Sequence, residues 1–381
     1  MKLLVLGAGL QGGAAVFDLL RNPEVERVGL ADVSSDRLEQ TRSRLDDRRL
    51  ATHELDVTDS ERATELMADY DACLSAVNYW FNVDLTRAAI EARTHFCDLG
   101  GNNTIVNEQL KLDAAAFAAG ITVVPDCGLA PGMANVLAAH GMRKLDEATS
   151  VRIRVGGLPQ HPKPPLDYQL AFAVEGLINE YVERCVVVRD GVKLSVEPLL
   201  ETEEIEFPEP FGKLECFNTS GGLSTLAKTF AGKVRDMDYK TIRYPGHAAK
   251  MRALLELGFF GGEALHVGDV ELKPRAFTAR LLENLLTGDD PDCVLVRVTV
   301  LGTKNGGRRR LEYELIDYYD GDNDITAMMR CTAYPASVVL QMLATKRIEP
   351  RGVVVQERCV PADEFITELQ KRGLKIVERQ S

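Results

Sequence analysis

Residues suited to acid–base and carboxylate chemistry gather around a Pro-Gly turn in the stretch TIRYPGH, residues 241–247. An arginine can clamp a carboxylate through two parallel hydrogen bonds, and an imidazole titrates near neutral pH. Arg243 is therefore a candidate ligand for an anionic substrate group, and His247 is a candidate general base. The same letters also fit a plain turn, in which Arg243 and Tyr244 lie on opposite faces of a strand and His247 caps the next helix. The pattern leaves both interpretations open.

A second chemical motif lies at the start of the chain, where the glycines of LVLGAGLQGG follow an apolar run and open a helix-like segment. In such a frame the glycines permit a tight turn, close approach of a pyrophosphate and close helix–strand packing. The helix N-terminus then offers N–H groups to the phosphates. The predicted cofactor contacts here are Gly7, Gly9, Leu10, Gln11 and Gly12.

Asp32 ends the next apolar run, LADV, twenty residues after Gly12. A carboxylate at this place can accept hydrogen bonds from both ribose hydroxyls and would repel a 2′-phosphate. The sequence therefore favours NAD over NADP as the cofactor.

Further candidate cofactor contacts follow later strands, because ligands of doubly wound sheets bind at the carboxyl ends of the strands. They are Asp56, Val57, Ser75, Ala76, Val77, Asn78, Leu99 and Gly100. Asp56 also fits a helix cap, since DVTDSE resembles a helix N-terminus. Asp98 and Asp126 end two more strands, and for them a helix-capping role is favoured.

The elements that must position these residues alternate strand and helix patterns through the first 125 residues. Short apolar runs bounded by Gly, Asp and Asn are typical of parallel strands covered on both faces. We predict an α/β fold with an N-terminal Rossmann domain, a doubly wound parallel sheet, over residues 1–127. Residues 326–381 are expected to fold back onto it.

Beyond residue 127 the pattern changes to long alternating strands and Pro-rich loops. Two alternating runs around Asn305-Gly306 predict a β-hairpin. We expect residues 128–325 to form an α+β substrate-binding and dimerisation domain with a mixed sheet, one side of which is covered by helices. Long exposed hairpin strands would leave an open sheet edge, so a homo-oligomer formed through this domain is expected.

Composition restricts the class of partner. The net charge of −12 argues against nucleic acid or an anionic membrane, and no apolar run is long enough to span a bilayer. Eight scattered cysteines without a CxxC pair favour a reduced cytoplasmic location and no zinc site. The opening MKLLVLGAG is too short in its apolar part for a signal peptide and is interpreted as a strand.

Several blocks together resemble the saccharopine-reductase-like enzymes, and within them the lysine 6-dehydrogenase group. The blocks are KLLVLGAGLQG, LADV, DLGG, PDCGLAPGM, PPLDYQLAFAVEGLINEY, TSGGLSTL, YKTIRYPGH and CTAYP. The resemblance runs from Met1 to about Arg372. It implies NAD-dependent oxidation of the ε-amine of lysine to an imine, followed by hydrolysis to the semialdehyde and ammonia.

Oxidation of a C–N bond needs an unprotonated nitrogen and anchors for the rest of the substrate. The ε-amine of lysine has a pKa near ~10.4, so a base or a desolvated pocket must remove a proton. His247 is the predicted base and Arg243 the clamp on the α-carboxylate. The further candidate substrate contacts are Glu175 toward an amino group, Tyr168 over the aliphatic stem, and Thr219 and Ser220 toward the carboxylate.

Two other functions remain open from the sequence. One is a dehydrogenase of the same family that acts on saccharopine, another amino acid or a carboxylated polyamine. The other is a sensor that binds NAD without chemistry. A small-molecule amino-acid substrate is common to the enzymatic alternatives.

Overall fold

The computed structural model describes residues 1–381, and the chain divides into two compact units. Unit 1 contains Met1–His140 and Met329–Ile376, and unit 2 contains Gly141–Met328 and Val377–Ser381. The division lies near the expected boundaries and differs from them at both junctions. Unit 1 continues into the helix that follows residue 127, and the last residues of the chain pair with a strand of unit 2.

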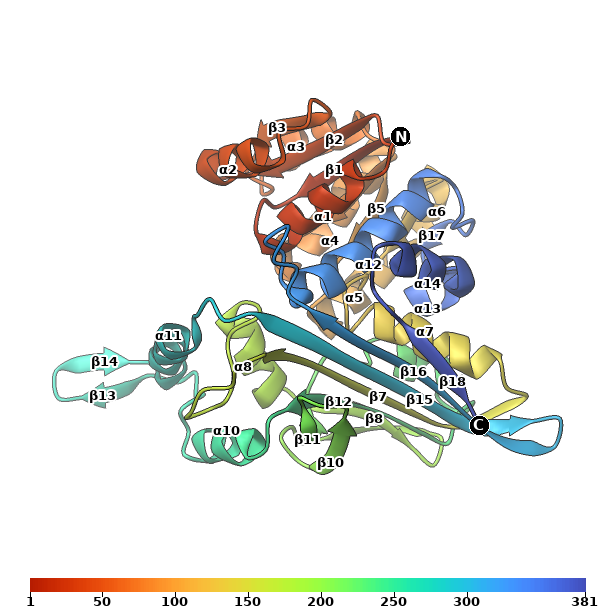
Figure 1. Cartoon of the computed structure of the whole chain (residues 1–381). Coiled ribbons are helices and arrows are strands. Elements are labelled where there is room, and N and C mark those ends of the chain that lie inside the picture. Colours follow the sequence, from red (N-terminus) through yellow and green to blue (C-terminus); the bar gives the residue numbers. More distant parts are fainter. The chain divides into compact units, whose positions relative to one another are not determined.

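Unit 1 is built on a sheet of seven parallel strands, shown in Figure 1. Their spatial order is β17 (Gly352–Val353), β6 (Thr122–Val124), β5 (His95–Asp98), β4 (Ala72–Ser75), β1 (Lys2–Leu6), β2 (Arg27–Asp32) and β3 (Leu50–Glu54). The direction of strand order reverses between β1 and β4, which is the place where dinucleotides bind in doubly wound sheets. The predicted doubly wound sheet is confirmed.

Helices connect these strands and cover the sheet. They are α1 (Leu10–Leu20), α2 (Ser35–Leu45), α3 (Ser60–Ala68), η1 (Tyr79–Phe81), α4 (Asn82–Ala92), α5 (Asn103–Leu110), α6 (Asp113–Ala119), α7 (Met133–Arg143), α12 (Ala327–Ala344), α13 (Gln356–Cys359) and α14 (Ala362–Lys371). The apolar run Leu3–Leu6 is fully buried, as expected for a strand covered on both faces. The carboxyl end of β1 is therefore enclosed by protein where it leads into the glycine turn.

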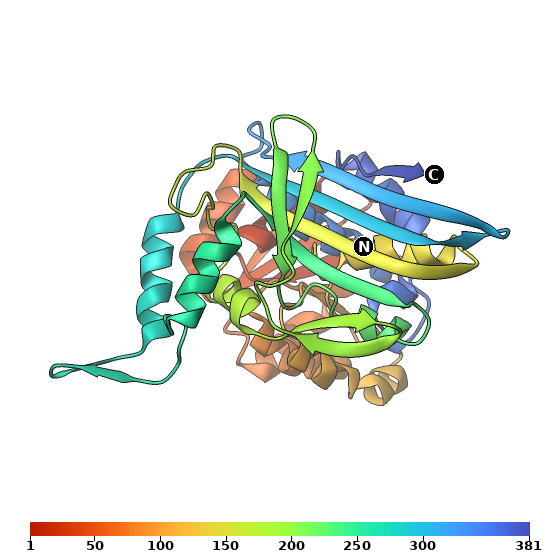
Figure 2. The ribbon, with the colours of Figure 1, turned by 90° about the horizontal axis from the view of Figure 1, so that it is seen from below.

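Unit 2 contains a mixed sheet of nine strands. They are β7 (Glu147–Pro159), β8 (Cys185–Arg189), β9 (Val192–Val196), β10 (Glu203–Phe207), β11 (Gly212–Asn218), β12 (Asp236–Arg243), β15 (Asp292–Lys304), β16 (Gly307–Tyr318) and β18 (Val377–Gln380). Strands β12 and β7 run parallel, and the other pairs are antiparallel. Figure 2 shows the long strands β7, β15 and β16 side by side.

The predicted hairpin is confirmed as β15–β16. Its turn residues Asn305 and Gly306 have φ angles of 53° and 75°, which suits a primed turn. The outer edge of β16 is partly covered by β18, so the expected open edge is shorter than the hairpin.

The remaining elements of unit 2 are α8 (Val174–Val182), α9 (Leu226–Phe230), α10 (His247–Glu256), α11 (Pro274–Leu286) and a separate hairpin of β13 (Leu265–Val267) and β14 (Val270–Leu272). Helices α8, α10 and α11 share one apolar core, to which Leu177, Met251 and Leu282 contribute. Ile178 and Tyr181 of α8 and Ala248 of α10 also lie in this core, which therefore packs α8 against the helix that follows β12.

All eight cysteines of the chain are buried and unpaired. No helix has the length and hydropathy needed to cross a bilayer.

Candidate functional site

The turn between β1 and α1 requires its glycines. Gly7 has a φ of 102°, donates its N–H to Ala31 O at 2.7 Å, and would place a Cβ 2.8 Å from Ala76 O. A Cβ on Gly12 would lie 1.7 Å from Gly7 O. Both positions therefore exclude any side chain, and the turn brings the β4 end against the first glycine.

The N-terminus of α1 is open. Gly9 occupies the N-cap position, no side chain caps the helix, and a Cβ at Gly9 would meet nothing within 4 Å. The first N–H groups of a helix lack intrahelical acceptors, so an uncapped end is suited to a phosphate. Gln11 adds a buried Oε1 with no hydrogen-bond partner. The arrangement fits the pyrophosphate of a dinucleotide.

Asp32 joins two loops at the end of β2. Its Oδ2 accepts the Ala8 N–H at 2.7 Å, and its Oδ1 accepts the Ser34 N–H at 2.8 Å. A carboxylate has about four acceptor positions, so capacity remains for a ribose diol. The carboxyl group is thus held at the end of β2, beside the loop that contains the glycines.

The β4 end lies beside Gly7, because Ala76 N–H donates to Leu6 O at 2.8 Å and Val77 packs against the first glycine. Ser75 Oγ donates to Asn82 Oδ1 at 2.7 Å, and Asn78 precedes η1. The structure thus brings Ser75, Ala76 and Val77 to the glycine turn, and Asn78 follows them in the chain.

The other predicted cofactor residues have clear local roles. Asp56 accepts hydrogen bonds from the N–H and the hydroxyl of Thr58 and does not cap α3, whose N-cap is Asp59; Val57 is half-buried beside it. Gly100, next to Leu99, has a φ of 76° and donates its N–H to Asp98 Oδ1 at 2.8 Å.

Asp98 is fully buried and also accepts hydrogen bonds from Gln109 Nε2 and the Asp126 N–H. Burial raises its pKa, and Asn102 is the residue that caps α5. The helix-capping role favoured for Asp98 is therefore wrong, because its carboxylate instead joins the ends of two strands.

In unit 2, the arginine of TIRYPGH is 2% exposed at the end of β12. Arg243 Nε donates to Tyr181 Oη at 3.2 Å, Nη1 donates to Ile242 O at 2.9 Å, and the guanidinium carbon lies 4.5 Å from the centre of the Tyr168 ring. A guanidinium has five N–H donors, and the other three have no acceptor. A buried arginine with unused donors is expected to bind an anion.

Glu180 faces this arginine. Its Oε2 lies 3.9 Å from Arg243 Nη2, which is too long for a hydrogen bond, and its side chain is 28% exposed. Burial raises the pKa of Glu180 to about 7, and the Arg243 charge opposes that rise. The carboxyl is enclosed by protein, yet more than a quarter of its side chain meets water, so protons can exchange there. The pair offers one cation and one titratable anion to a ligand.

His247 is linked to Arg243 through Tyr181. Its Nδ1 lies 2.9 Å from Leu166 O and its Nε2 lies 3.0 Å from Tyr181 Oη, so both ring nitrogens are used. The ring is 1% exposed among Tyr168, Tyr181 and Phe217. Burial and the Arg243 charge lower its pKa to about 3. His247 therefore contacts Tyr181, which in turn accepts the Arg243 Nε–H; its role as a general base stays a prediction.

A pH dependence of stability follows from His247. The pKa of His247 is about 3 in the folded protein and near the ordinary 6.5 in the unfolded chain. Between these pH values the unfolded chain binds a proton that the folded protein does not, so the free energy of unfolding falls as the pH falls from 6.5 toward 3. We expect the free energy of unfolding to drop by a few kcal/mol over this window, and His247→Gln to flatten the drop. Urea unfolding at several pH values checks this, with exposed His266→Gln as the control. Equal slopes in all three proteins would contradict it.

Of the other predicted substrate residues of unit 2, one contacts Arg243 and the rest have different partners. Tyr168 contacts its guanidinium, whereas Glu175 forms an ion pair with Arg275 and is 56% exposed. Thr219 Oγ1 lies 2.7 Å from Thr241 Oγ1, and Ser220 Oγ donates to Asn179 O at 3.2 Å.

Sequence reasoning missed Glu180 and Tyr181. Leu177, Ile178 and Tyr181 are the buried positions of α8, and their helical spacing was a usable signal. The spacing places Tyr181 on the buried face and Glu180 next to it.

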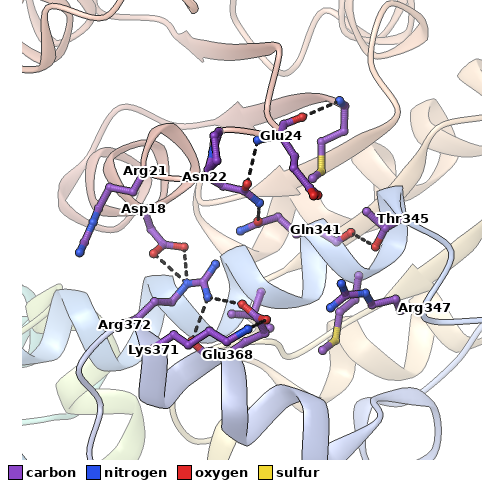
Figure 3. A pocket seen from close by; sticks show the side chains of 14 residues that line it. Asp18, Arg21, Asn22, Glu24, Gln341, Thr345, Arg347, Glu368, Lys371 and Arg372 are labelled. Atoms are coloured by element: carbon purple, nitrogen blue, oxygen red, sulfur yellow. Dashed lines mark hydrogen bonds and ion pairs between the residues drawn. The ribbon is translucent and has the colours of Figure 1, made fainter.

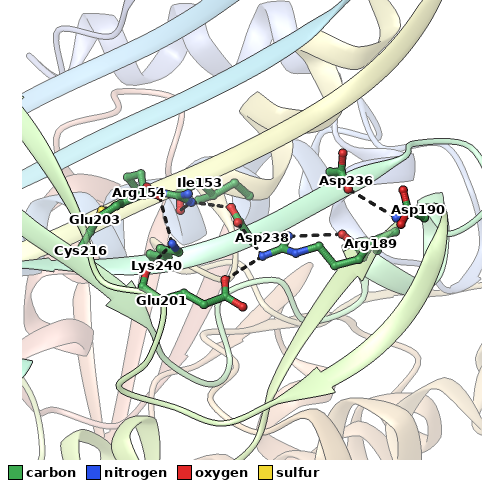
Figure 4. A network of polar contacts seen from close by, with 11 residues as sticks. Ile153, Arg154, Arg189, Asp190, Glu201, Glu203, Cys216, Asp236, Asp238 and Lys240 are labelled. Carbon is green, nitrogen blue, oxygen red and sulfur yellow. Dashed lines mark hydrogen bonds and ion pairs between the residues drawn. The ribbon is translucent and has the colours of Figure 1, made fainter. Parts of the chain in front are cut away.

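A second charged cluster in unit 2, drawn in Figure 4, lies on the opposite face of β12, since alternate residues of a strand point to opposite sides. Arg154 donates to Glu203 and to Asp238, and Lys240 Nζ lies 3.1 Å from Glu203 Oε2. Its charges satisfy one another, unlike those of Arg243 and Glu180.

A cavity of about 410 Å³ lies in unit 1 between α1, α12 and α14 (Figure 3). Arg372 there pairs with buried Asp18 and with Glu368. None of the predicted site residues lines this cavity, and its main ion pairs fasten the C-terminal segment to α1.

Comparison with known proteins places both units in one family. Residues 3–124 match the model of the saccharopine dehydrogenase NADP binding domain, and residues 128–374 match that of the saccharopine dehydrogenase C-terminal domain.

Among curated proteins, the chain is similar to saccharopine dehydrogenase [NADP(+), L-glutamate-forming] of Saccharomyces cerevisiae. The identity is 26% over 241 residues, which are 61% of this chain and 52% of that protein. It is also similar to the mitochondrial alpha-aminoadipic semialdehyde synthase of Rattus norvegicus, with 21% identity over 82% of this chain and 34% of that protein. The matches thus span about half or less of the length of these relatives.

Among solved structures, the apo saccharopine dehydrogenase (L-Glu forming) of Saccharomyces cerevisiae has a similar fold, with a TM-score of 0.82 and 18% identity over 100% of this chain and 99% of that one. The open glycine turn and the two family matches lead to one conclusion. This chain belongs to the saccharopine dehydrogenase family.

Proposed function

We propose that this protein is an NAD-dependent dehydrogenase that oxidises the ε-amine of L-lysine, with release of the 6-semialdehyde and ammonia. The observation that supports it most is the pairing of Arg243 with Glu180. The α-carboxylate and α-ammonium of an amino acid lie on one carbon, so a guanidinium and a carboxylate 3.9 Å apart can bind both. The ε-carbon of the same substrate is then free to react.

The reaction balances without a further oxidant. The C–H bond of the ε-carbon breaks as hydride leaves, the amine gives up one proton to solvent water, and a C=N bond forms. Water then adds to this imine, ammonia leaves, and the semialdehyde can cyclise with its own α-amine. NAD, when bound at the glycine turn, would accept the hydride. The residues of unit 2 bind the amino-acid head group, and Tyr181 and His247 hold Arg243 in place for it.

Asp32 supports NAD as the cofactor, although the matching family domain is named for NADP. A 2′-phosphate near this carboxylate would meet a like charge and displace two backbone hydrogen bonds. We expect NAD to bind at least tenfold more tightly than NADP, and Asp32→Ser to narrow that ratio to within a few-fold. Calorimetric titration with both cofactors measures it. Asp36→Ser, on the exposed start of α2, is the control, and an unchanged ratio in Asp32→Ser would contradict the assignment.

The names of the curated relatives favour a second candidate substrate, saccharopine. It carries a glutamate moiety on the ε-nitrogen and therefore two more carboxylates to bind. In the cluster of Arg243, Glu180, Tyr181 and His247, one guanidinium has unused donors. A single guanidinium of this kind supports a substrate with a single carboxylate. An additional basic contact for the glutamate moiety would favour saccharopine instead.

Formation of reduced cofactor tests the proposal. Purified protein with NAD is mixed in separate samples with L-lysine, ornithine, saccharopine and pentane-diamine, which lacks the carboxylate. We expect turnover with L-lysine and none with the diamine. Turnover with saccharopine alone would keep the family chemistry and overturn the substrate. Cofactor binding without turnover of any amine would support the alternative function, a sensor that binds NAD and catalyses no reaction.

A further inference from the structure

The hairpin of β13 and β14 projects from unit 2 beyond α10 and α11, as Figures 1 and 2 show. Its two strands pair only with each other, and every residue from Gly261 to Val270 is exposed. A single two-stranded hairpin is marginally stable in water unless it packs on another surface. Contact with another surface would therefore stabilise this hairpin.

One face of the hairpin is entirely apolar. The register pairs Leu265 with Leu272 and Val267 with Val270, so these four side chains share one face, while His266 and Glu271 share the other. Leu265, Val267 and Val270 are 54%, 61% and 62% exposed. Such a two-sided pattern is typical of a strand ribbon that is covered on one face.

Helix α11 presents a second uncovered apolar surface. Its inner face, with Thr278, Ala279, Leu282 and Leu286, is buried in the core of unit 2. On its outer face Phe277, Leu281 and Leu285 follow at four-residue spacing and are 52%, 49% and 54% exposed. The spacing forms one stripe along the helix.

We propose that these two surfaces bind each other between two copies of this chain. In a two-fold dimer a contact of surface A with surface B occurs twice, so the hairpin face of each protomer would cover the α11 stripe of the other. Seven large apolar side chains form a patch on the order of several hundred Å² per chain, which approaches the roughly 800 Å² that each partner buries in a standard interface.

The charges beside the two surfaces are complementary. Glu263, Asp269 and Glu271 are exposed acidic residues in the hairpin or directly before it. Lys273 and Arg280 flank the stripe at the start and middle of α11; the side chain of Arg280 is 71% exposed and pairs with Glu283 of the same helix. Exchange of hairpins between two protomers brings these acidic and basic groups together. Opposite charges at the rim of an apolar contact favour one register of association.

The experiment compares two substitutions that add the same charge to opposite faces of the hairpin. Val267→Asp places a carboxylate on the apolar face, and His266→Asp places one on the polar face of the adjacent residue. Light scattering after size exclusion, over a dilution series, gives the mass of each protein. We expect a wild-type dimer, a dissociation constant raised roughly a hundredfold or more in Val267→Asp, and no comparable change in His266→Asp. Leu281→Asp should dissociate the dimer as Val267→Asp does.

Hydrogen exchange of the wild-type protein provides a measurement that needs no variant. The amides of residues 263–272 should be protected at high concentration and should lose protection on dilution. A monomeric wild type, or equal effects of Val267→Asp and His266→Asp, would overturn the proposal. The proposal would also be overturned if Val267→Asp dissociated the dimer and Leu281→Asp left it intact. In that case the hairpin would bind a surface other than the α11 stripe.

Discussion

Replacement of Arg243 by lysine is expected to lower kcat/KM for L-lysine by roughly a hundred- to a thousandfold, or about 3–4 kcal/mol. Lysine keeps the charge and loses the planar pair of donors that fits a carboxylate. It also loses the hydrogen bond to Tyr181, so the head-group site would be both less complementary and less ordered. Most of the loss should appear in KM, because the interaction is with a part of the substrate that does not react.

Arg275→Lys is the matched control for this prediction. Arg275 belongs to the same unit and pairs with exposed Glu175 at the surface, where ion pairs contribute little. Steady-state kinetics of both variants, with the melting temperature as a check on folding, decides the outcome. If the two variants retain equal activity, Arg243 does not bind the substrate.

Replacement of Glu180 by glutamine is expected to weaken binding of L-lysine and to stabilise the free protein. The variant removes the partner of the α-ammonium, so KM should rise roughly tenfold to a hundredfold above pH 7. In the wild type KM should itself rise as the pH falls below about 7, because protonated Glu180 no longer attracts the ammonium. The KM of Glu180→Gln should lack this dependence.

The effect on stability has the opposite sign. Because the pKa of Glu180 is raised to about 7 from 4.5, its ionised form is held at a cost that grows as the pH rises through this range. Glu180→Gln should therefore be more stable than the wild type by about 1–3 kcal/mol near pH 8 and equally stable near pH 4.5. Partial contact of the side chain with water limits the gain. Glu175→Gln, on the same helix and exposed, should show neither effect.

These results could be contradicted in two independent ways. A lower stability of Glu180→Gln near pH 8 would mean that the carboxylate stabilises the fold by its pairing with Arg243. An unchanged KM would mean that the amino acid binds elsewhere. A site that gains stability when its charge is removed is characteristic of a binding function.

The fold of unit 1 could be predicted from local pattern, because each strand is a continuous apolar run and each glycine of the turn has a steric requirement. Gly12 illustrates this, since a Cβ there would overlap Gly7 O. The β15–β16 hairpin could likewise be predicted from the turn residues Asn305 and Gly306. Such features depend on neighbours in sequence or on a periodic face, and both are visible without a structure.

The head-group cluster could be predicted only in part, because its geometry depends on contacts between elements far apart in the sequence. Arg243 was recognised, whereas Glu180 comes from α8, more than sixty residues earlier. Sequence also gave no measure of burial for His247, whose two nitrogens are taken by Leu166 and Tyr181. Spacing within TIRYPGH carries no information about these long-range partners.

The most direct test of the proposed reaction is to follow the ε-nitrogen of the substrate. L-lysine labelled with heavy nitrogen at the ε-position alone is incubated with the protein and NAD, and the released ammonia is analysed by mass spectrometry. Oxidation of the ε-amine predicts that the ammonia carries the label, in equal amount to the reduced cofactor. Unlabelled ammonia, or reduced cofactor without ammonia, would contradict the proposal.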